Sequence, residues 1–299
     1  MKITLEEMQV FLAVVDSGTL TAAAEQLGQT ASGASRSLSR LESKLATTLL
    51  RRTTRRLELT EEGMAFRAQA RDILDSVERL EEQMAARRGQ PAGVLRVDAA
   101  SPFMLHVVVP LIAGYRERYP AVQLELSNNE GFIDLLERRT DVALRIGELK
   151  DSTLHARPIG RSRLRVLASP EYLARHRAPQ RARDLDCHAL LGFSQPESLN
   201  EWPLMDGDKR LHVRPTLRAS SGETLRQLAL DGNGLVCLSD FMTGQDRREG
   251  RLVQVLEDQT VPVFQPVNAV YYRQTAIAAR IASFVDYLAQ QVRERGLEL

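Results

Sequence analysis

Basic and hydroxyl side chains gather in one short stretch near the N-terminus of this 299-residue chain. Residues 36–56 contain seven Lys or Arg residues and one acidic residue, a net charge of +6, whereas the whole chain carries +1. Guanidinium groups bind phosphates and guanine edges, and hydroxyl groups donate to phosphates. A local basic cluster on a nearly neutral chain indicates contact with a polyanion. The alternative is a solvated helix face, which charge alone does not exclude.

Three short predicted helices position these side chains. The segment from Thr4 to Asp16 begins with a capping box and has apolar residues at helical spacing. A second helix begins after Thr19, and a turn at Gly28 leads to a third helix capped by Thr30. A short helix, a glycine turn and a longer helix are typical of a helix-turn-helix, whose second helix enters the major groove of DNA.

The third helix and the segment after it provide the expected DNA contacts. In the helix, Ala34, Leu38, Leu41 and Leu45 recur at steps of 4, 3 and 4 and form the predicted buried stripe. The run LLRRTTRRLELT at 49–60 predicts a short β-ribbon, or wing, that carries arginines. We expect DNA to be contacted by Thr30, Ser32, Ser35, Arg36, Ser39 and Arg40 on the helix, and by Arg52, Arg55 and Arg56 on the wing.

A long predicted helix follows, from about residue 61 to residue 88. Its apolar residues are spaced 4, 3, 4, 3 and 4 apart, which is a heptad seam. We expect two copies of the chain to pair through Phe66, Ala70, Ile73, Val77, Leu80 and Met84. The alternative is a helix packed on its own domain. Two-fold pairing would place the third predicted helix of one copy and that of its partner one or more DNA turns apart, on an inverted repeat.

From residue 94 onward, short apolar runs alternate with helical patterns. Predicted strands lie at 94–99, 122–127, 141–146, 164–169, 189–194, 234–239 and 267–272, and predicted helices at about 103–118, 131–139, 222–231 and 275–293. Pro110 kinks the first of these helices or marks its start. The alternation indicates an α/β fold with a mostly parallel sheet, as one large domain or two smaller ones.

Ligands of such folds bind beyond the carboxyl ends of the strands. Ser101 and Pro102 follow the first strand and can begin a helix whose free amides face a crevice, and Ser220 and Ser221 can do so from the opposite side. For each residue taken singly, a cap, a turn or, for Arg145, a surface ion pair is the alternative. The expected effector-binding residues are Ser101, Pro102, Asn128, Asn129, Arg145, Phe193, Ser194, Ser220 and Ser221.

The composition excludes several classes of protein. With 43% hydrophobic and 26% charged residues, the chain is typical of soluble globular proteins. Two cysteines, Cys187 and Cys237, exclude a disulfide framework and are expected in the core. No signal peptide and no membrane span is recognisable, so we expect a cytoplasmic protein without a membrane partner. Neither a metal motif nor a nucleophile–base set is present, so we expect no metal, no cofactor and no enzymatic activity.

Residues 11–63 resemble the LysR-type transcriptional regulators. The resemblance rests on Phe11, Gly18-Thr19, Ala22–Ala24, Ser35-Arg36, Leu41-Glu42, Arg52 with Arg55, and Leu59-Thr60 with Gly63. Further likeness extends over essentially the full chain, at Tyr119-Pro120, Asp141–Gly147, Ala168–Leu173 and Gly232–Gly234.

The resemblance implies a winged helix-turn-helix, a linker helix and a periplasmic-binding-protein-like effector domain. The implied boundaries are 1–60 for the DNA-binding domain, 61–93 for the dimerisation helix and hinge, and 94–299 for the effector domain. Within the last, subdomain I spans about 94–161 and 267–299, and subdomain II about 162–266. Ala31 and Gly33 stand where the family often has Gln and Ala, so readout should depend more on Ser32, Ser35, Arg36 and the wing.

Together these features predict a sequence-specific transcriptional regulator controlled by a small-molecule effector of unknown identity. Its expected partners are a double-stranded DNA operator, the effector, and itself as a dimer or tetramer. Two alternatives stay open: a constitutive architectural DNA-binding protein without a ligand, and an enzyme with a DNA-binding appendage.

Overall fold

The computed structural model describes residues 2–52, 57–86, 91–130, 140–149, 154–272 and 278–294. The chain divides into two compact units, Met1–Arg87 and Arg88–Leu299. In the described residues, no helix has both the length and the apolar character needed to cross a membrane.

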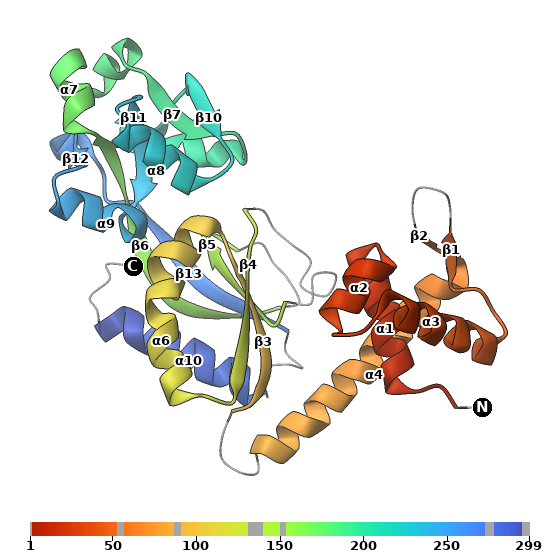
Figure 1. The fold of residues 1–299 in the computed structure, drawn as a ribbon. Helices are drawn as coiled ribbons and strands as arrows, with labels where there is room; N and C mark the ends of the chain where they lie inside the picture. The colour runs from red at the N-terminus through yellow and green to blue at the C-terminus, as the bar shows by residue number, and fades with distance from the viewer. Residues whose placement is uncertain are drawn as a thin grey trace. The chain divides into compact units, whose positions relative to one another are not determined.

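The first unit contains helices and one short antiparallel ribbon (Figure 1). Its elements are α1 (Leu5–Ser17), α2 (Leu20–Gln26), α3 (Ala31–Leu45), β1 (Leu50–Arg52), β2 (Leu57–Leu59) and α4 (Glu61–Ala86). The predicted caps are confirmed. The Thr4 hydroxyl accepts the Glu7 amide while the Glu7 carboxylate accepts the Thr4 amide, and Thr19 and Thr30 accept the amides of Ala22 and Gly33. These caps satisfy backbone amides that a helix start leaves unpaired.

The apolar stripes of the first three helices meet in one core. Phe11 of α1 and Leu38 and Leu41 of α3 are buried there, as the spacing predicted. Phe66 of α4 joins this core, since its ring packs edge-on against Phe11 with 5.1 Å between the centroids. The first turns of α4 therefore belong to the core of the first unit, and their packing fixes where α4 leaves that core.

The second unit is built on one continuous mixed sheet with the strand order β10-β7-β11-β6-β13-β5-β3-β4, and β12 pairs with β6 on the edge opposite β11. A separate two-stranded ribbon is formed by β8 and β9. The strands are β3 (Gly93–Ala99), β4 (Val122–Asn128), β5 (Val142–Ile146), β6 (His155–Ala168), β7 (Leu190–Phe193), β8 (Glu201–Asp206), β9 (Lys209–His212), β10 (Leu217–Ala219), β11 (Leu235–Ser239), β12 (Val253–Gln254) and β13 (Phe264–Tyr271).

The long strand β6 divides this sheet into two halves. We call β3, β4, β5 and β13 with their helices the first half, and β7, β10, β11 and β12 with theirs the second half. The expectation of a mostly parallel sheet is wrong, because β13 runs antiparallel to β5 and β6, and β11 and β12 run antiparallel to β6. Parallel pairs remain within each half, such as β3 with β4 and β7 with β11. Apolar runs predict a buried strand but carry no information on its direction.

Helices cover both halves. In the first half, α6 and α10 lie on one face of the sheet (Figure 1), where the Tyr115 and Phe284 rings pack 5.2 Å apart. The predicted helix at 103–118 is continuous from residue 101, but it changes geometry part-way, and the predicted helix at 131–139 lies outside the described residues. The helical elements are α5 (Ser101–Phe103), η1 (Met104–Val108), α6 (Val109–Arg118), α7 (Pro170–His176), η2 (Ala182–Cys187), η3 (Glu197–Asn200), α8 (Gly222–Leu230), α9 (Asp240–Arg248), η4 (Glu257–Gln259) and α10 (Ala279–Glu294).

The two cysteines differ from the expectation that both are core residues. Cys237 lies buried in β11, and burial raises the pKa of its thiol far above the ordinary value, so it stays protonated and unreactive. Cys187 ends η2 and is exposed, so the core prediction is wrong for this residue. The helical turn that carries Cys187 buries Leu185 instead.

Candidate nucleic-acid interface and effector site

The outward face of α3 carries the predicted DNA-contacting side chains. Arg36, Ser39 and Arg40 are exposed, as are Thr30 and Ser32 at the helix start, while Ser35 is half-buried. The Arg36 side chain donates one hydrogen bond, from Nε to the Ser32 carbonyl at 3.3 Å, which leaves its terminal nitrogens available to solvent. A planar guanidinium on a rigid helix can donate two parallel bonds to a base edge or a phosphate.

The start of α3 is closely built around its cap. The Thr30 hydroxyl accepts the Gly33 amide at 3.1 Å and lies 3.2 Å from the Ser32 hydroxyl. A methyl group added at Gly33 would lie 3.1 Å from the Thr30 hydroxyl oxygen, which is a tight contact. Gly33, the departure noted in the sequence, therefore gives the cap room, and the short hydroxyls stay at the positive end of the helix dipole.

A buried ion pair holds α3 against α1. Glu7 is 3% exposed, and Lys44 donates to both of its carboxylate oxygens at 2.7 and 2.9 Å. The hydrogen bond from Lys44 outweighs burial and lowers the pKa of Glu7. Arg40 approaches the same carboxylate, with 3.8 Å between Nε and Oε1. This pair joins residues 37 positions apart, and the sequence analysis missed it.

The wing is anchored by α3. The Glu42 carboxylate accepts the amides of Leu49 and Leu50 at 2.8 and 3.1 Å, and β1 pairs with β2 from Leu50–Leu59 to Arg52–Leu57. Arg51 is exposed on β1. Of the predicted wing contacts, Arg55 and Arg56 lie outside the described residues, as does the side chain of Arg52.

The predicted pairing seam divides at about residue 70. Ala70 is 1% exposed in its own chain and Phe66 packs on Phe11, so the pairing prediction is corrected for these two residues, which stabilise the core of the first unit. Ile73 and Leu80 are 41% and 56% exposed and Val77 is half-buried, at the same heptad spacing. The side chain of Met84 lies outside the described residues.

Two of the predicted effector residues of the first half, Asn129 and Arg145, donate to a carboxylate that the sequence analysis missed. Asp98 in β3 is fully buried and accepts hydrogen bonds from Ser127, Asn129 and Arg145, the last at 3.0 Å. Arg145 therefore pairs with a buried carboxylate rather than with a surface one, while Asn128 is exposed. An acidic residue near the end of a mostly apolar strand was the available signal.

The sequence analysis predicted free amides at the helix start of Ser101, but the Ser101 amide is paired. Ala100 rather than Ser101 is the cap residue of α5, and the Ser101 amide donates to the Glu130 carboxylate at 3.3 Å. In the second half, Ser221 caps α8 by accepting the Glu223 amide at 3.3 Å, and Ser220 is exposed. The helix start in the first half is thus covered by an acidic side chain of the same chain.

Two of the predicted residues meet where the halves touch. A methyl group built on Gly222 would lie 3.3 Å from Pro102 and 3.6 Å from the ring of Phe193. Pro102 comes from the first half and Phe193 from the second, so the fold brings them together at the start of α8. Ser194 beside them donates its amide to the Ala219 carbonyl at 2.9 Å and so helps to join β7 to β10.

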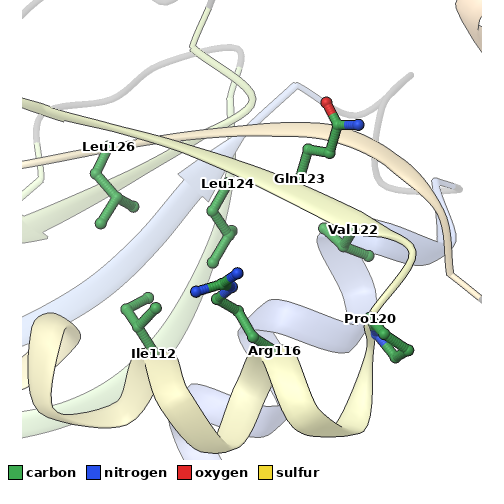
Figure 2. A pocket seen from close by; sticks show the side chains of 7 residues that line it. All are labelled: Ile112, Arg116, Pro120, Val122, Gln123, Leu124 and Leu126. Carbon is green, nitrogen blue, oxygen red and sulfur yellow. The ribbon is translucent and has the colours of Figure 1, made fainter.

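A separate concave surface lies between α6 and β4. It encloses about 500 Å³ and is lined by Ile112, Arg116, Pro120, Val122, Gln123, Leu124 and Leu126. Figure 2 shows Ile112 and Arg116 rising from α6 toward Leu124 and Leu126, which point down from the strand. Because β4 ends the strand order in the described part of the sheet, its outer edge has no neighbouring strand there.

Two family models match the chain in tandem. The bacterial regulatory helix-turn-helix of the LysR family matches residues 5–64, and the LysR substrate-binding domain matches residues 88–293. The chain belongs to the LysR family. It is a DNA-binding transcriptional regulator with a C-terminal effector-binding domain, and the exposed face of α3 lies on the helix that follows the turn of this DNA-binding fold.

Full-length LysR-type relatives support this assignment. The regulator CrgA of Neisseria meningitidis serogroup C is 47% identical over 293 residues, which cover 98% of each chain. The solved structure of CrgA from Neisseria meningitidis has a TM-score of 0.66, at 97% coverage of this chain and 99% of that one. The full-length structure of AphB, a virulence activator of Vibrio cholerae, is 27% identical with a TM-score of 0.62, at 96% and 99% coverage.

Proposed function

We propose that this LysR-type regulator reads an inverted repeat through the exposed face of two α3 helices, and that a small molecule between the halves of the second unit controls this binding. The observation that carries the proposal is the exposure of Arg36, Ser39 and Arg40 on one face of α3 while Leu38 and Leu41 fill the core behind it. The boundaries 1–60, 61–93 and 94–299 are part of the proposal. So are action in the cytoplasm and the absence of enzymatic activity.

Selection of bound sequences from a random DNA pool tests this function. We expect the full-length chain to enrich an inverted repeat whose half-sites are separated by about 10–10.5 base pairs or a multiple of that. Enrichment without any repeat would contradict two-fold reading. Binding without enrichment of any sequence would favour the constitutive architectural protein instead, because contacts to phosphates carry no sequence information.

The wing should act mainly through charge. Arg55→Ala together with Arg56→Ala is expected to weaken binding to all sequences alike and to reduce the slope of log affinity against log salt by about 2, since each lost phosphate contact removes about one unit. Fluorescence anisotropy at a series of KCl concentrations measures the slope. An unchanged slope would remove the two arginines from the interface.

Two apolar surfaces of the described chain are suited to contact between copies. On α4, Ile73, Val77 and Leu80 continue the heptad seam beyond the turns that pack on the DNA-binding core. On the second unit, Leu126 of β4, which lines the concave surface, is 40% exposed, and Leu105 and Val109 of the helix that continues into α6 are 48% and 47% exposed. Apolar side chains beside an open strand edge are a favourable contact for a second copy of the same surface.

The oligomeric state tests these two surfaces separately. We expect Ile73→Glu with Leu80→Glu to abolish pairing through α4, and Leu126→Glu to abolish pairing through β4, because each change brings a charge into an apolar contact. In analytical ultracentrifugation, either set of substitutions alone should reduce the number of copies in the assembly, and the combination should give monomers. If the combination leaves the wild-type assembly intact, both surfaces are wrongly assigned.

A further inference from the structure

The helix that starts at Ser101 crosses from the first half of the sheet to the second. Pro102 contacts the start of α8 at Gly222, and the ring of Phe103 packs against Phe241 of α9 with 5.3 Å between the centroids. Phe103 and Phe241 belong to one buried core that includes residues of both halves. The position of residues 101–108 therefore sets how the two halves meet.

The helix changes its geometry at this crossing, and Pro110 accounts for the change. Residues Met104–Val108 form a π-helical turn, in which the Val109 amide donates to the Met104 carbonyl five residues back. Pro110 has no amide hydrogen, so it cannot donate to the carbonyl of His106 as an α-helix would require. The wider turn relieves this constraint, and π-helical turns are frequent at functional sites.

The π-helical turn places His106 against the other half. His106 Nε2 lies 2.7 Å from the Oε2 atom of Glu223, in the first turn of α8. Glu223 is itself held, because its Oε1 atom accepts a hydrogen bond from Arg226 at 2.8 Å. Arg226 in turn donates two bonds, at 2.6 and 2.8 Å, to Asp246 of α9, which is fully buried. His106 therefore contacts a part of the second half that is held in place by the ion pairs of Glu223, Arg226 and Asp246.

We propose that His106 and Glu223 form a latch that fixes the spacing between the two rows of effector-binding residues. One row, Ser101 and Pro102, lies on the helix that carries His106, and the other, Ser220 and Ser221, is separated from Glu223 by Gly222 alone. His106 is a positioning residue in this role, since it acts through the helix rather than on the ligand. The assignment of these two rows to effector binding rests on the proposed function, whereas the latch between His106 and Glu223 is testable without a ligand.

The latch is suited to control spacing rather than overall stability. The His106 and Glu223 side chains are 23% and 27% exposed, and a partly exposed ion pair contributes little to the free energy of unfolding. The apolar contacts of Phe103 and Phe241 remain when it breaks. Loss of the pair should therefore loosen the contact between the halves locally while the fold persists.

Hydrogen–deuterium exchange of the full-length chain, read by mass spectrometry, tests the latch. His106→Leu keeps a side chain that favours helix but removes the hydrogen bond. His106→Gln keeps an amide that can still donate to Glu223. His212→Leu is the matched control, because His212 of β9 pairs with Glu197 of η3 at 3.3 Å, outside residues 101–109 and 222–230.

We expect His106→Leu to speed exchange about fivefold both in residues 101–109 and in residues 222–230, the loss expected for one partly exposed pair. His106→Gln should restore wild-type exchange, and His212→Leu should leave both segments unchanged. The proposal is overturned if His106→Leu leaves either segment at the wild-type rate, or if the Gln variant exchanges like the Leu variant. Failure of the wild-type chain to bind DNA would instead contradict the proposed function and leave this result standing.

Discussion

Replacing Arg36 with alanine is expected to weaken operator binding by about 1–3 kcal/mol, which is about 5- to 150-fold at 25 °C. Arg36 is exposed in the middle of the polar face of α3, and its hydrogen bond to the Ser32 carbonyl uses Nε. The terminal nitrogens are therefore available for a base edge. Since the loss concerns a base contact, binding to unrelated DNA should fall much less than binding to the operator.

The measurement is an anisotropy titration of the full-length chain with operator and with scrambled DNA. Arg183→Ala is the matched control, because it removes an exposed arginine of the second unit and the same charge. Thermal unfolding should be unchanged in both variants, since Arg36 makes no buried contact. Equal operator affinity in the Arg36 variant and the wild type would refute its assigned role.

Replacing Lys44 with methionine is expected to destabilise the first unit by about 3–5 kcal/mol. Lys44 binds both oxygens of the buried Glu7 carboxylate, and the variant removes both of these bonds and leaves only the more distant Arg40, at 3.8 Å. A loss of this size is a large share of the about 5–15 kcal/mol that stabilises a typical domain. Adding Glu7→Gln to the variant should restore most of the loss, because the buried charge is then gone.

The effect of Lys44→Met should depend on pH. Lys44 holds the pKa of Glu7 below its ordinary value of 4.5, so the pair stabilises the wild type above that pH. This stabilisation disappears as the pH falls through the lowered pKa of the folded state. In the variant, the buried carboxyl group can instead become neutral in mild acid. The difference in unfolding free energy between variant and wild type should therefore begin to shrink above pH 4.5, as the variant's carboxyl group becomes neutral, and should shrink further as the pH falls through the lowered pKa of the wild type.

The two units provide an internal control for this experiment. Trp202 is the single tryptophan of the chain and lies buried in the second unit, so its fluorescence reports the unfolding of that unit. Circular dichroism reports the helices of both units. We expect Lys44→Met to lower the circular dichroism transition of the first unit while the Trp202 transition stays in place. A shift of both transitions, or of neither, would contradict a local role for the pair.

The DNA-binding unit was predictable from sequence because its signals are local. Thr4, Thr19 and Thr30 each lie at most three residues from the amides that they cap, and the apolar stripe of α3 repeats within one helix. The Glu7–Lys44 pair was not predictable, since its partners are 37 residues apart and a charged residue type does not indicate a buried position. The heptad seam was misassigned at Phe66 and Ala70 because a core-facing stripe and a pairing stripe have the same spacing.

In the effector domain, the sequence predicted the strands better than their arrangement. The runs that form β3, β4, β5 and β11 were located, but the antiparallel pairing of β6 with β13 depends on residues about 100 positions apart. His106 and Glu223 are 117 positions apart, so their pairing could not be predicted from the sequence either. Asp98 was overlooked because a single carboxylate in a strand has no meaning until its partners from β4 and β5 are in place.

Photo-crosslinking from α3 to DNA tests the central claim most directly. A benzoylphenylalanine residue at the exposed position Ser39 should crosslink to bases within each half-site of the selected operator, whereas the same residue at the exposed position Gln69 of α4 should not. Mapping of the crosslinked nucleotides by primer extension measures both. Crosslinks at 69 with none at 39, in a chain that still binds the operator, would contradict the assignment of α3 as the DNA-reading helix.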